Sequence, residues 1–429
     1  KLNILIITYY WPPSGGSGVQ RWMFFAKYLK QFGHNPIILT VDPKYASYNL
    51  IDNSLIDQVK DIEAHKTASF EILKLYSIFK SGNKNRAIPQ SYIPTQSFFD
   101  KIASFIRLNF FIPDSRIGWN YFAFKKAKKL IEENNINCVI TTGPPHSSHL
   151  IGKKIYNKFK LKWIVDLRDP WAELFYLKNK FQFNYVKKLN LKFELDVLNS
   201  ADAILTTVGN RYKTILRDKL SNTNKIYKIY NGYDKIAYDK IEEIKPDSYN
   251  IVFTGILSKN HNYQLFLEVL RLLKDKYKDL NMIFTFAGKI DKKIKNLFSE
   301  KIQLIDNGYV THEKAIKIIK SSHLLINFNY LNTEDTDMVS GKLIEYLASG
   351  SPIINFSNSA HESNIILQNS KKSFNADSND IMKVMDFIKK EYDNWLDGNY
   401  KKEIPKNIES LSREKLTDNL IDLIKNLVV

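Results

Sequence analysis

One stretch near the end of the chain, residues 324–356, limits the possible folds more than any other. Two apolar runs, Leu324–Phe328 and Pro352–Phe356, are typical of buried strands. Between them, residues 342–348 have the pattern of a short helix, which a glycine and a proline end. A strand, a helix and a second strand in this order predict a parallel α/β sheet, in which ligands bind at the carboxyl ends of the strands.

The loop and the first turn of this helix suit a sugar nucleotide. We expect the helix to start near Gly341, where free N–H groups favour a phosphate, and Lys342 adds a full positive charge. Asp337 and Glu345 bracket this point, eight positions apart. Carboxylates suit sugar hydroxyls, because each accepts two hydrogen bonds side by side. The alternative is an ordinary βαβ unit with acids on its surface.

This stretch resembles the carboxylate–seven residues–glutamate signature of the retaining family-4 glycosyltransferases, which have the GT-B fold. The run EYLASGSP, from Glu345 to Pro352, is close to the usual family sequence. The resemblance implies that Glu345 holds the nucleotide ribose and Asp337 the donor sugar, with Gly341 and Leu343 also in the donor site. The family usually has glutamate at the first acid position, where this chain has the shorter aspartate.

Cysteine usage and hydropathy favour a cytoplasmic protein. Cys138 is the only cysteine, so no disulfide can form within the chain, which suits a reducing compartment. The chain opens directly into an apolar strand, and we see no signal peptide. No apolar run approaches the ~20 residues that a membrane span needs.

The net charge of +18 is unevenly distributed. Residues 1–250 hold 38 Lys and Arg against 22 Asp and Glu, whereas the rest holds 25 against 23. We find no zinc-finger spacing and no RNA-binding aromatic signature, so nucleic acid is not an expected partner. An anionic membrane surface is the favoured interpretation, with peripheral contact at the inner face of the cytoplasmic membrane, and a merely solvated basic face is the alternative. The lysines of one basic stretch are Lys178, Lys180, Lys187, Lys188 and Lys192.

The chain begins with a buried strand, residues 3–9, followed by a loop that contains Gly15 and Gly16 and by a helix from Trp22. A glycine turn between strand and helix lets the backbone approach a ligand. Its spacing differs from the dinucleotide fingerprint, which argues against an oxidoreductase. The loop resembles the opening of the same glycosyltransferases, where it touches donor phosphates or the acceptor.

A stripe of apolar residues at helical spacing lies between Phe98 and Phe110, with Lys101 and Arg107 beside it. Such a stripe is typical either of an interfacial helix in contact with lipid or, more often, of a helix that faces the protein core.

Two further strand ends carry candidate acceptor residues. His146 follows the strand 137–142, and Arg168 and Asp169 follow the strand 162–166. Both runs resemble a subgroup of family-4 enzymes from bacterial polysaccharide synthesis, although relatives carry His-Asp in place of Arg168-Asp169. An internal Arg–Asp ion pair is the alternative for that dipeptide. A metal at the histidine pair is not expected, because no acid or cysteine follows nearby.

The second half begins with the strand 250–254, followed by Gly255. In the family an arginine usually follows this glycine and a lysine comes a few residues later, both binding the diphosphate. This chain has Ile256 and Lys259 there, so Lys342 is a candidate to replace the missing charge. The turn at Tyr309 and Val310 corresponds to the one that contacts the base in the family; a plain strand-to-helix turn is the alternative.

We therefore expect an α/β protein of two Rossmann-like domains that face each other across a cleft, the GT-B fold. Residues 1–240 form the acceptor domain, residues 249–409 the nucleotide-sugar domain, and a helix at 410–429 crosses back onto the first. The expected activity is a retaining hexosyltransferase for surface polysaccharide or glycoconjugate synthesis, acting on a glycan or lipid-linked glycan. Asp337, Lys342 and Lys259 are the expected catalytic residues.

The run Asp335-Thr-Asp337 has the Asp-x-Asp pattern that holds a divalent metal in GT-A glycosyltransferases. It comes directly before the helix already assigned, so we expect no metal here, and no cofactor is expected either. Two rival functions remain open. One is a sugar-nucleotide epimerase of the same fold, and the other is a nucleotide-sugar-binding protein without catalytic activity.

Overall fold

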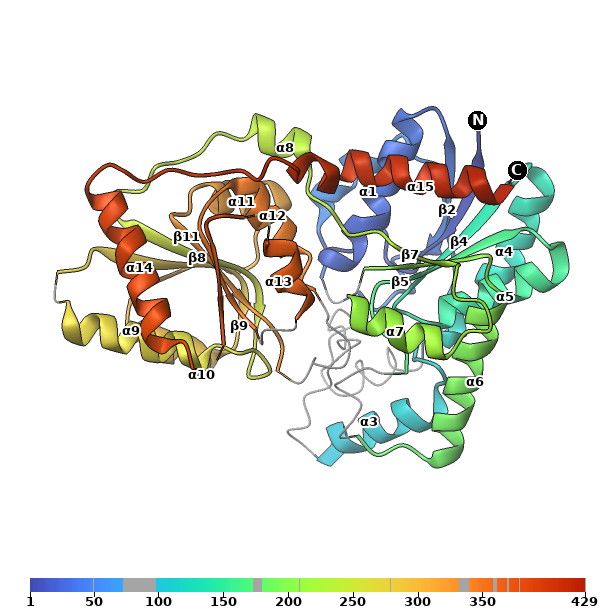
Figure 1. The fold of residues 1–429 in the computed structure, drawn as a ribbon. Helices are drawn as coiled ribbons and strands as arrows, with labels where there is room; N and C mark the ends of the chain where they lie inside the picture. Colours follow the sequence, from blue (N-terminus) through green and yellow to red (C-terminus); the bar gives the residue numbers. More distant parts are fainter. Residues whose placement is uncertain are drawn as a thin grey trace. The chain divides into compact units, whose positions relative to one another are not determined.

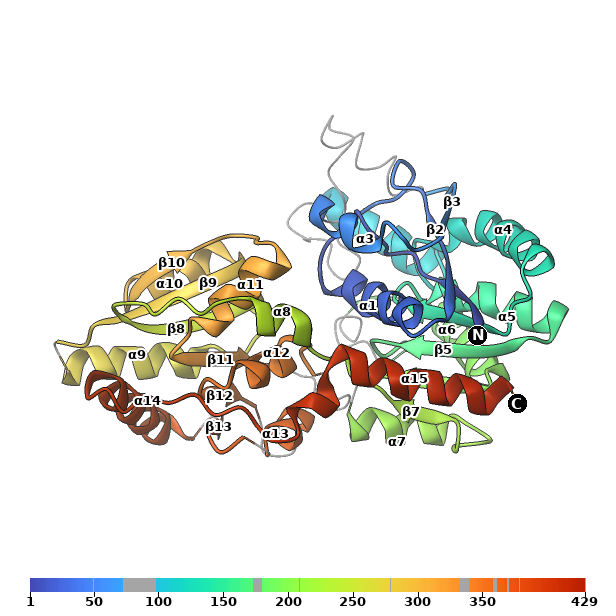
Figure 2. The same cartoon turned by 90° about the horizontal axis from the view of Figure 1, so that it is seen from above.

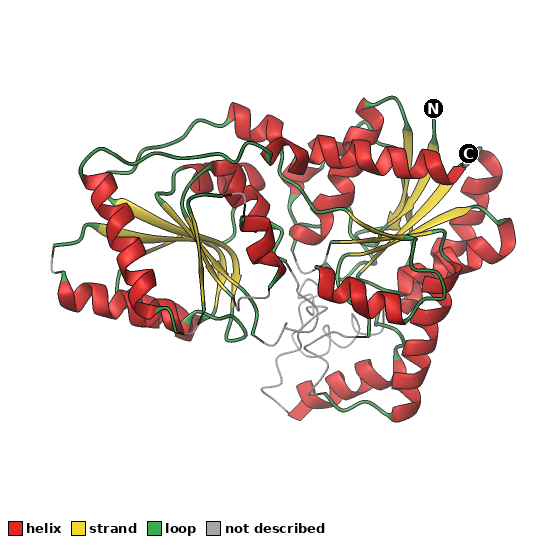
Figure 3. Ribbon diagram, in the orientation of Figure 1, coloured by secondary structure: helices red, strands yellow, loops and turns green. Residues whose placement is uncertain are grey.

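The computed structural model describes residues 1–48, 50–71, 98–172, 180–207, 209–277, 279–331, 339–357, 361–368, 370–377 and 379–428. They form two compact units, the first made of Lys1–Tyr230 and Thr417–Val429 and the second of Asn231–Leu416. Each unit is an α/β domain built on one parallel sheet, with helices on both faces of that sheet (Figures 1 and 3). The two Rossmann-like domains expected from the sequence are confirmed.

The first unit has a seven-stranded sheet in the order β3-β2-β1-β4-β5-β6-β7. Its central strands are unbroken apolar runs and are buried on both faces, as parallel sheets require. The strands are β1 (Asn3–Ile7), β2 (Asn35–Val41), β3 (Ala64–Thr67), β4 (Cys138–Gly143), β5 (Lys162–Leu167), β6 (Ala203–Thr206) and β7 (Ile226–Lys228).

In the first unit α4, α5 and α6 pack side by side, and α1 covers the other face of the sheet (Figure 1). α1 begins at Ser17, five residues before the Trp22 start that we expected, because Gly16 is the N-cap, with a φ of 87°. The helices are α1 (Ser17–Gln31), α3 (Phe98–Phe110), α4 (Asn120–Glu133), α5 (Ser147–Phe159), α6 (Asn184–Ser200), α7 (Asn210–Asp218) and, mostly, α15 (Arg413–Val428).

The second unit has a six-stranded sheet in the order β10-β9-β8-β11-β12-β13, which Figure 2 shows from one edge to the other. The connection from β10 to β11 crosses behind β9 and β8, so the strand order reverses between β8 and β11. Ligands bind at such a switch point in open α/β sheets. The strands are β8 (Tyr249–Leu257), β9 (Met282–Ile290), β10 (Gln303–Asp306), β11 (Leu324–Phe328), β12 (Ile353–Phe356) and β13 (Ser373–Ala376).

α9 and α14 pack against each other on one face of this sheet, and α11 and α12 pack against each other on the other face (Figure 1). The helices are α8 (Lys235–Lys240), α9 (Gln264–Lys276), α10 (Lys292–Ser299), α11 (His312–Lys320), α12 (Lys342–Ser349), α13 (Glu362–Leu367) and α14 (Ile381–Leu396). Four short 3-10 turns complete the description: Asn53–Leu55, Asp57–Val59, Ile117–Trp119 and Ile408–Leu411.

Three asparagines stand in register across β11, β12 and β13. Asn327 pairs with Asn355, and Asn355 pairs with Asn375. The Asn355 carboxamide accepts a hydrogen bond from Asn327 Nδ2 (2.7 Å) and donates one to Asn375 Oδ1 (3.1 Å). This asparagine ladder belongs to a larger polar cluster, because Asn355 also forms hydrogen bonds with Asn329, Ser357, Ser363 and Asn364.

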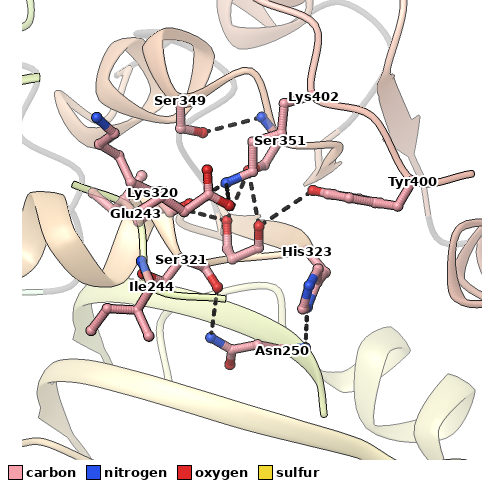
Figure 4. Close-up of polar contacts among 12 residues, drawn as sticks. Glu243, Ile244, Asn250, Lys320, Ser321, His323, Ser349, Ser351, Tyr400 and Lys402 are labelled. Carbon is pink, nitrogen blue, oxygen red and sulfur yellow. Dashed lines mark hydrogen bonds and ion pairs between the residues drawn. The ribbon is translucent and has the colours of Figure 1, made fainter. Parts of the chain in front are cut away.

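Lys320 and Lys402 hold the segment 238–243 near the amino ends of the strands in the second sheet (Figure 4). Lys320 Nζ donates hydrogen bonds to the carbonyl oxygens of Tyr238 (2.6 Å) and Ile241. Lys402 Nζ pairs with Glu243 Oε1 at 2.7 Å and also donates to the carbonyl of Lys320. The segment 238–248, which joins the two ranges expected as domains, therefore includes the end of α8 and is held by side chains of its own unit.

Within the described ranges, no helix combines the length and the apolar character needed to cross a membrane.

Candidate functional site

The carboxyl end of β8 in the second unit is shaped by two glycines. Gly255 and Gly288 pair across β8 and β9 with φ angles of 111° and 141°, in the region that favours glycine. A Cβ at Gly288 would lie 1.9 Å from the Gly255 carbonyl oxygen, so no larger residue fits. The Thr254 N–H donates to Tyr346 Oη at 2.8 Å, which ties this strand end to α12.

Lys342, at the first position of α12, lies over this strand end. Its Nζ is 3.6 Å from the centroid of the Phe253 ring, and a Cβ at Gly255 would lie 3.7 Å from the same atom. Among the described residues no carboxylate pairs with it. Burial lowers the pKa of Lys342 to about 7. A desolvated ammonium above an aromatic ring, with no acid beside it in the described chain, is a site prepared for an anion.

His261 is the titratable neighbour of Lys342. Burial, and then the charge of Lys342, lower its pKa to about 4, so it is neutral at pH 7. Its ring packs against Tyr330, with the centroids 4.1 Å apart, and Ser258 Oγ lies 3.1 Å from its Nδ1. The histidine therefore adds polar surface to the site without changing its charge.

Glu345 lies one turn further along α12 and is held by two side chains. His312 Nε2 is 2.8 Å and Arg413 Nη2 is 3.3 Å from its Oε1. Burial alone would raise the pKa of this carboxyl, but the charge and hydrogen bond of His312 and the charge of Arg413 outweigh burial and lower it. Both contacts fall on Oε1, so Oε2 keeps no partner in the described part of the chain. An ionised carboxylate with one oxygen fixed and the other available suits a pair of hydroxyls.

The other expected donor residues of the second unit are spread around this centre. Gly341 is the N-cap of α12, and the Leu343 side chain is buried while its N–H already donates to the Ser340 carbonyl at 3.1 Å. Lys259 is exposed in the turn after β8. Tyr309 is half exposed and Val310 partly buried in the turn between β10 and α11.

Ile256, which stands where the family usually has arginine, is 58% exposed immediately after Gly255. Asp337 and Asp335 lie outside the described residues. The sugar ligand expected at Asp337 therefore stays a prediction.

In the first unit, a buried network fixes the carboxyl end of β5. Asp166 accepts hydrogen bonds from Arg21 (2.9 Å), Trp22 Nε1 (2.6 Å) and Thr142 Oγ1 (2.8 Å). Arg21 also donates to the Ile229 carbonyl at 2.9 Å. Every partner is buried, so this ion pair braces the sheet edge.

Arg168 belongs to the same strand end and binds three backbone carbonyls, one in the first turn of α1 and two at the end of β4. Its guanidinium donates to the carbonyl oxygens of Gly18, Gly143 (3.2 Å) and Pro144. The alternative of an internal ion pair with Asp169 is not what the structure contains, because no such contact occurs between these two described residues. Arg168 therefore connects the start of α1 to the turn before α5.

Asp169 is left without a hydrogen bond or ion pair in the described ranges. Burial raises the pKa of its carboxyl; the charge of Arg168 opposes this and that of Asp166 adds to it. A half-buried carboxyl with a raised pKa at a strand's carboxyl end is a candidate to meet a polar ligand.

His146 is buried beside this carboxyl's loop. Its ring stacks on Trp171, with centroids 4.9 Å apart, and its Nε2 lies 3.2 Å from the Pro170 carbonyl oxygen. Burial, and then the charge of His149, lower the pKa of His146 well below its usual range. Across the described residues, His146 Nδ1 has no hydrogen-bond partner, and a Cβ at Gly143 would lie 2.7 Å from it.

The glycine loop of the first unit is tied to the segment after β2. The Gly15 N–H donates to the Leu50 carbonyl at 2.9 Å, and a Cβ at Gly15 would lie 3.1 Å from the side chains of Leu50 and Asp52. Gly16 is the N-cap of α1. A side chain at Gly15 would therefore need a small shift of its neighbours, whereas the positive φ of Gly16 favours glycine.

No group of three or more His, Cys, Asp or Glu side chains within the described part of the chain is placed to hold a metal ion.

Four residues of these sites were not singled out from the sequence. Asp166 lies near the end of a predicted strand, and His312 follows the turn after another strand. Their positions at strand ends could have marked them as candidates. Arg21 and Arg413 reach their carboxylates from 145 and 68 residues away in the chain; the resemblance of the glycine loop includes Arg21, but no local pattern marks Arg413.

Comparison with known proteins identifies the second unit. Residues 248–393 match the family model described as glycosyl transferases group 1, so this unit contains a domain of that kind. No curated protein sequence matches the chain significantly.

Solved structures share the complete fold at low identity. Sucrose-phosphate synthase from Thermosynechococcus elongatus is 13% identical with a TM-score of 0.61, covering 100% of this chain and 99% of that one. Anabaena Alr3699/HepE in complex with UDP-glucose is 10% identical with a TM-score of 0.62, covering 99% and 100%. A Listeria monocytogenes protein described as a UDP-N-acetylglucosamine 2-epimerase is 10% identical with a TM-score of 0.52, covering 99% and 96%. These likenesses establish the GT-B fold.

Proposed function

We propose that the chain is a retaining, metal-independent glycosyltransferase that moves a hexose from a nucleoside-diphosphate sugar to a glycan or lipid-linked glycan. In this proposal the protein works in the cytoplasm, without a cofactor, in the synthesis of a bacterial surface polysaccharide or glycoconjugate. The second unit binds the donor and the first unit binds the acceptor.

The observation that carries the proposal is the position of Lys342. Its ammonium is desolvated above Phe253, next to the backbone of Gly255, and has no acidic partner in the described chain. It lies in the domain that matches group 1 glycosyl transferases. A diphosphate would supply the missing negative charge, and the charge of Lys342 would stabilise the departing diphosphate as the glycosidic bond breaks.

Glu345 supports the donor assignment in a second way. His312 and Arg413 both bind its Oε1, so the carboxylate group cannot rotate freely and Oε2 keeps a fixed direction. We assign this carboxylate to the ribose hydroxyls. Asp337 is assigned to the donor sugar on the resemblance alone.

On the acceptor side, we assign Asp169 to a hydroxyl of the acceptor. The carboxyl has no partner in the described residues, and its raised pKa fits a group that exchanges a hydrogen bond with a hydroxyl. Arg168 acts here as a positioning residue, because its guanidinium is committed to three backbone carbonyls. His146 faces the same turn and stays neutral.

The chemistry needs no protein nucleophile in this proposal. The bond from the sugar C1 to the phosphate oxygen breaks, and the acceptor oxygen forms the new bond on the same face. The proton of the acceptor hydroxyl passes to the departing phosphate, as the family resemblance implies.

A screen of nucleotide sugars by thermal shift tests donor binding first. A ligand at one hundred times its dissociation constant adds roughly 2.7 kcal/mol to stability, which is readily measured. The same screen with Lys342→Met should give a clearly smaller shift. A wild-type protein that responds to no nucleotide sugar would contradict the proposal.

Metal independence is tested separately. With the donor found by the screen, transfer should continue in EDTA, because Lys342 supplies the charge that a cation would otherwise supply. Loss of activity in EDTA that magnesium or manganese restores would instead favour a metal site at Asp335 and Asp337.

A sugar-nucleotide epimerase is the second candidate function, because the Listeria monocytogenes protein described as an epimerase shares the fold. It is separated by incubating the enzyme with the donor alone. Epimerised sugar without any acceptor would favour that rival, and binding without any product across a panel of acceptors would favour a non-catalytic binder.

A further inference from the structure

An exposed apolar surface lies on the first unit, built from α3 and from the segment that leads into α6. We call it the α3–α6 patch. Phe110 is 67% exposed, Phe181 66% and Tyr185 72%. The members of the patch are Ile102, Phe105, Ile106, Phe110, Phe181, Phe183, Tyr185 and Leu191.

Two segments about 70 residues apart are fixed to each other to form this patch. Phe105 stacks on Phe181, with centroids 6.0 Å apart, and meets Phe183 edge-on at 5.6 Å. Between them, the buried Asn109 accepts a hydrogen bond from the Phe183 N–H at 2.8 Å and donates one to the Phe105 carbonyl at 2.9 Å. The aromatic side chains are therefore held outward by a defined backbone connection.

The structure decides between the two interpretations of the apolar stripe of α3. Ala103 and Asn109 face the protein, whereas Ile102, Phe105 and Ile106 are each about 40% exposed, on the outer face. Since isolated exposed apolar residues are normal but a contiguous aromatic group is not, this face is built to meet another apolar phase.

The two segments that form the patch carry an excess of positive charge, although Asp100 lies in α3 and Glu194 and Asp196 lie further along α6. Residues 101–113 and 180–193 contain no aspartate or glutamate, but between them hold Lys101, Arg107, Lys180, Lys187, Lys188 and Lys192. On α6, Tyr185, Lys188 and Lys192 are three and four residues apart, so the aromatic ring and the two ammonium groups share one face of the helix.

We propose that the α3–α6 patch binds the surface of an anionic lipid bilayer. The aromatic side chains would enter the interface between headgroups and acyl chains, and the lysines would contact the acidic headgroups. A second copy of this chain is a poor occupant, because two such patches would bring two basic rims together. The inference rests on the first unit alone and does not depend on the proposed reaction.

Vesicle co-sedimentation tests the proposal with the full-length protein. Vesicles of phosphatidylglycerol and phosphatidylcholine should bind the protein, and vesicles of phosphatidylcholine alone should bind it far more weakly. Binding should decrease as salt rises, because screening shortens the range of charge interactions to a few ångströms. Equal binding to both kinds of vesicle, or binding to neither, would overturn the proposal.

Paired variants separate the two contributions. Lys188→Gln and Lys192→Gln should each weaken binding about fivefold, the loss expected for one basic residue near an anionic surface. Phe110→Ser with Phe181→Ser should weaken binding at high salt as well. The matched control is Tyr121→Ser with Lys125→Gln on α4, an equally exposed aromatic and lysine of the same unit, which should leave binding unchanged.

A fluorescent label reports insertion directly. Cys138 is the only cysteine and is buried, so a polarity-sensitive dye will react with a cysteine introduced at the surface. A dye on Tyr185→Cys should shift to shorter wavelength on anionic vesicles, and a dye on Tyr121→Cys should not. A lipid-independent shift at Tyr185→Cys that grows with protein concentration would instead indicate self-association and would overturn the bilayer assignment.

Discussion

Lysines at the amino and carboxyl ends of the strands in the second sheet have different surroundings. At the amino edge, Lys320 and Lys402 have their ammonium groups engaged by carbonyl oxygens and, for Lys402, by the carboxylate of Glu243 (Figure 4). At the carboxyl edge, Lys342 is equally withdrawn from water but meets only an aromatic ring and backbone in the described chain. Burial lowers the pKa of both Lys402 and Lys342, but fixed partners partly compensate Lys402, whereas Lys342 has no such partner in the described residues.

The comparison is tested most directly by removing one lysine from each edge. Lys342→Met should weaken donor binding about 10- to 100-fold, since hydrogen bonds to charged groups contribute about 1.5–3 kcal/mol. It should also raise the melting temperature, because burial disfavours the ammonium form. Calorimetry and thermal unfolding measure the two effects.

Lys402→Met is the matched variant and should do the reverse. Donor affinity stays the same. The melting temperature falls by about 2–4 °C for each kcal/mol lost, because the Glu243 carboxylate and the Lys320 carbonyl lose their partner, although burial lowers the pKa of Lys402 as well. Reduced donor affinity in Lys402→Met, or a destabilised Lys342→Met, would remove the distinction between the edges.

The pH dependence of donor binding gives the next largest effect. The pKa of Lys342 is about 7 in the free protein, and a bound diphosphate raises it. Above pH 7 the free protein must take up a proton to bind, so affinity should fall by up to about tenfold per pH unit. Calorimetry in buffers of different ionisation enthalpy should show proton uptake near pH 8 in the wild type and none in Lys342→Met.

The same group affects stability with a defined sign. Because the folded-state pKa of Lys342 lies below the unfolded value of about 10.4, the unfolded chain binds more protons between about pH 7 and 10.4. This contribution to the free energy of unfolding therefore rises with pH across that window. Lys342→Met should lack the rise, while Lys402→Met should keep it.

Glu345→Gln should have a smaller effect on donor affinity, a loss of about fivefold to tenfold. The amide oxygen still accepts from His312, but the charged acceptor for the ribose is gone, which removes about 1 kcal/mol. Glu313→Gln, at an exposed acid of the neighbouring helix α11, is the control. Unchanged affinity in Glu345→Gln would contradict the ribose assignment.

The smallest change expected is a gain. Ile256→Arg places a second cation beside Gly255, where the family resemblance puts arginine, and should tighten donor binding a few-fold. Leu297→Arg on α10 controls for the added net charge. Binding in Ile256→Arg that is no tighter than in Leu297→Arg would contradict a position of this side chain beside the diphosphate.

The fold and the centre of the donor site were predictable because their signals are local. The apolar runs and the glycine after β8 mark the strands and their ends, and Lys342 and Glu345 lie three residues apart on one helix. The partners of Glu345 were not predictable, because His312 and Arg413 come from other elements of the unit.

Local charge patterns were also misleading in one place. Adjacent Arg168 and Asp169 suggest an ion pair, but backbone carbonyls at the start of α1 and the end of β4 bind the guanidinium instead. For α3, helical periodicity cannot tell an outward stripe from an inward one, since both give the same spacing. The contacts of Asn109 with the start of α6 decide its orientation.

The asparagine ladder has a consequence for how the second sheet assembles. β11 and β12 share the triplet Ile-Asn-Phe and are buried on both faces, so hydrophobic burial alone hardly opposes a slip of one strand by one residue. A slip would break the hydrogen bonds from Asn327 Nδ2 to Asn355 Oδ1 and from Asn355 Nδ2 to Asn375 Oδ1, at a cost of about 0.5–1.5 kcal/mol for each. The asparagine ladder therefore favours one register of β11 against β12 over other registers that bury similar apolar surface.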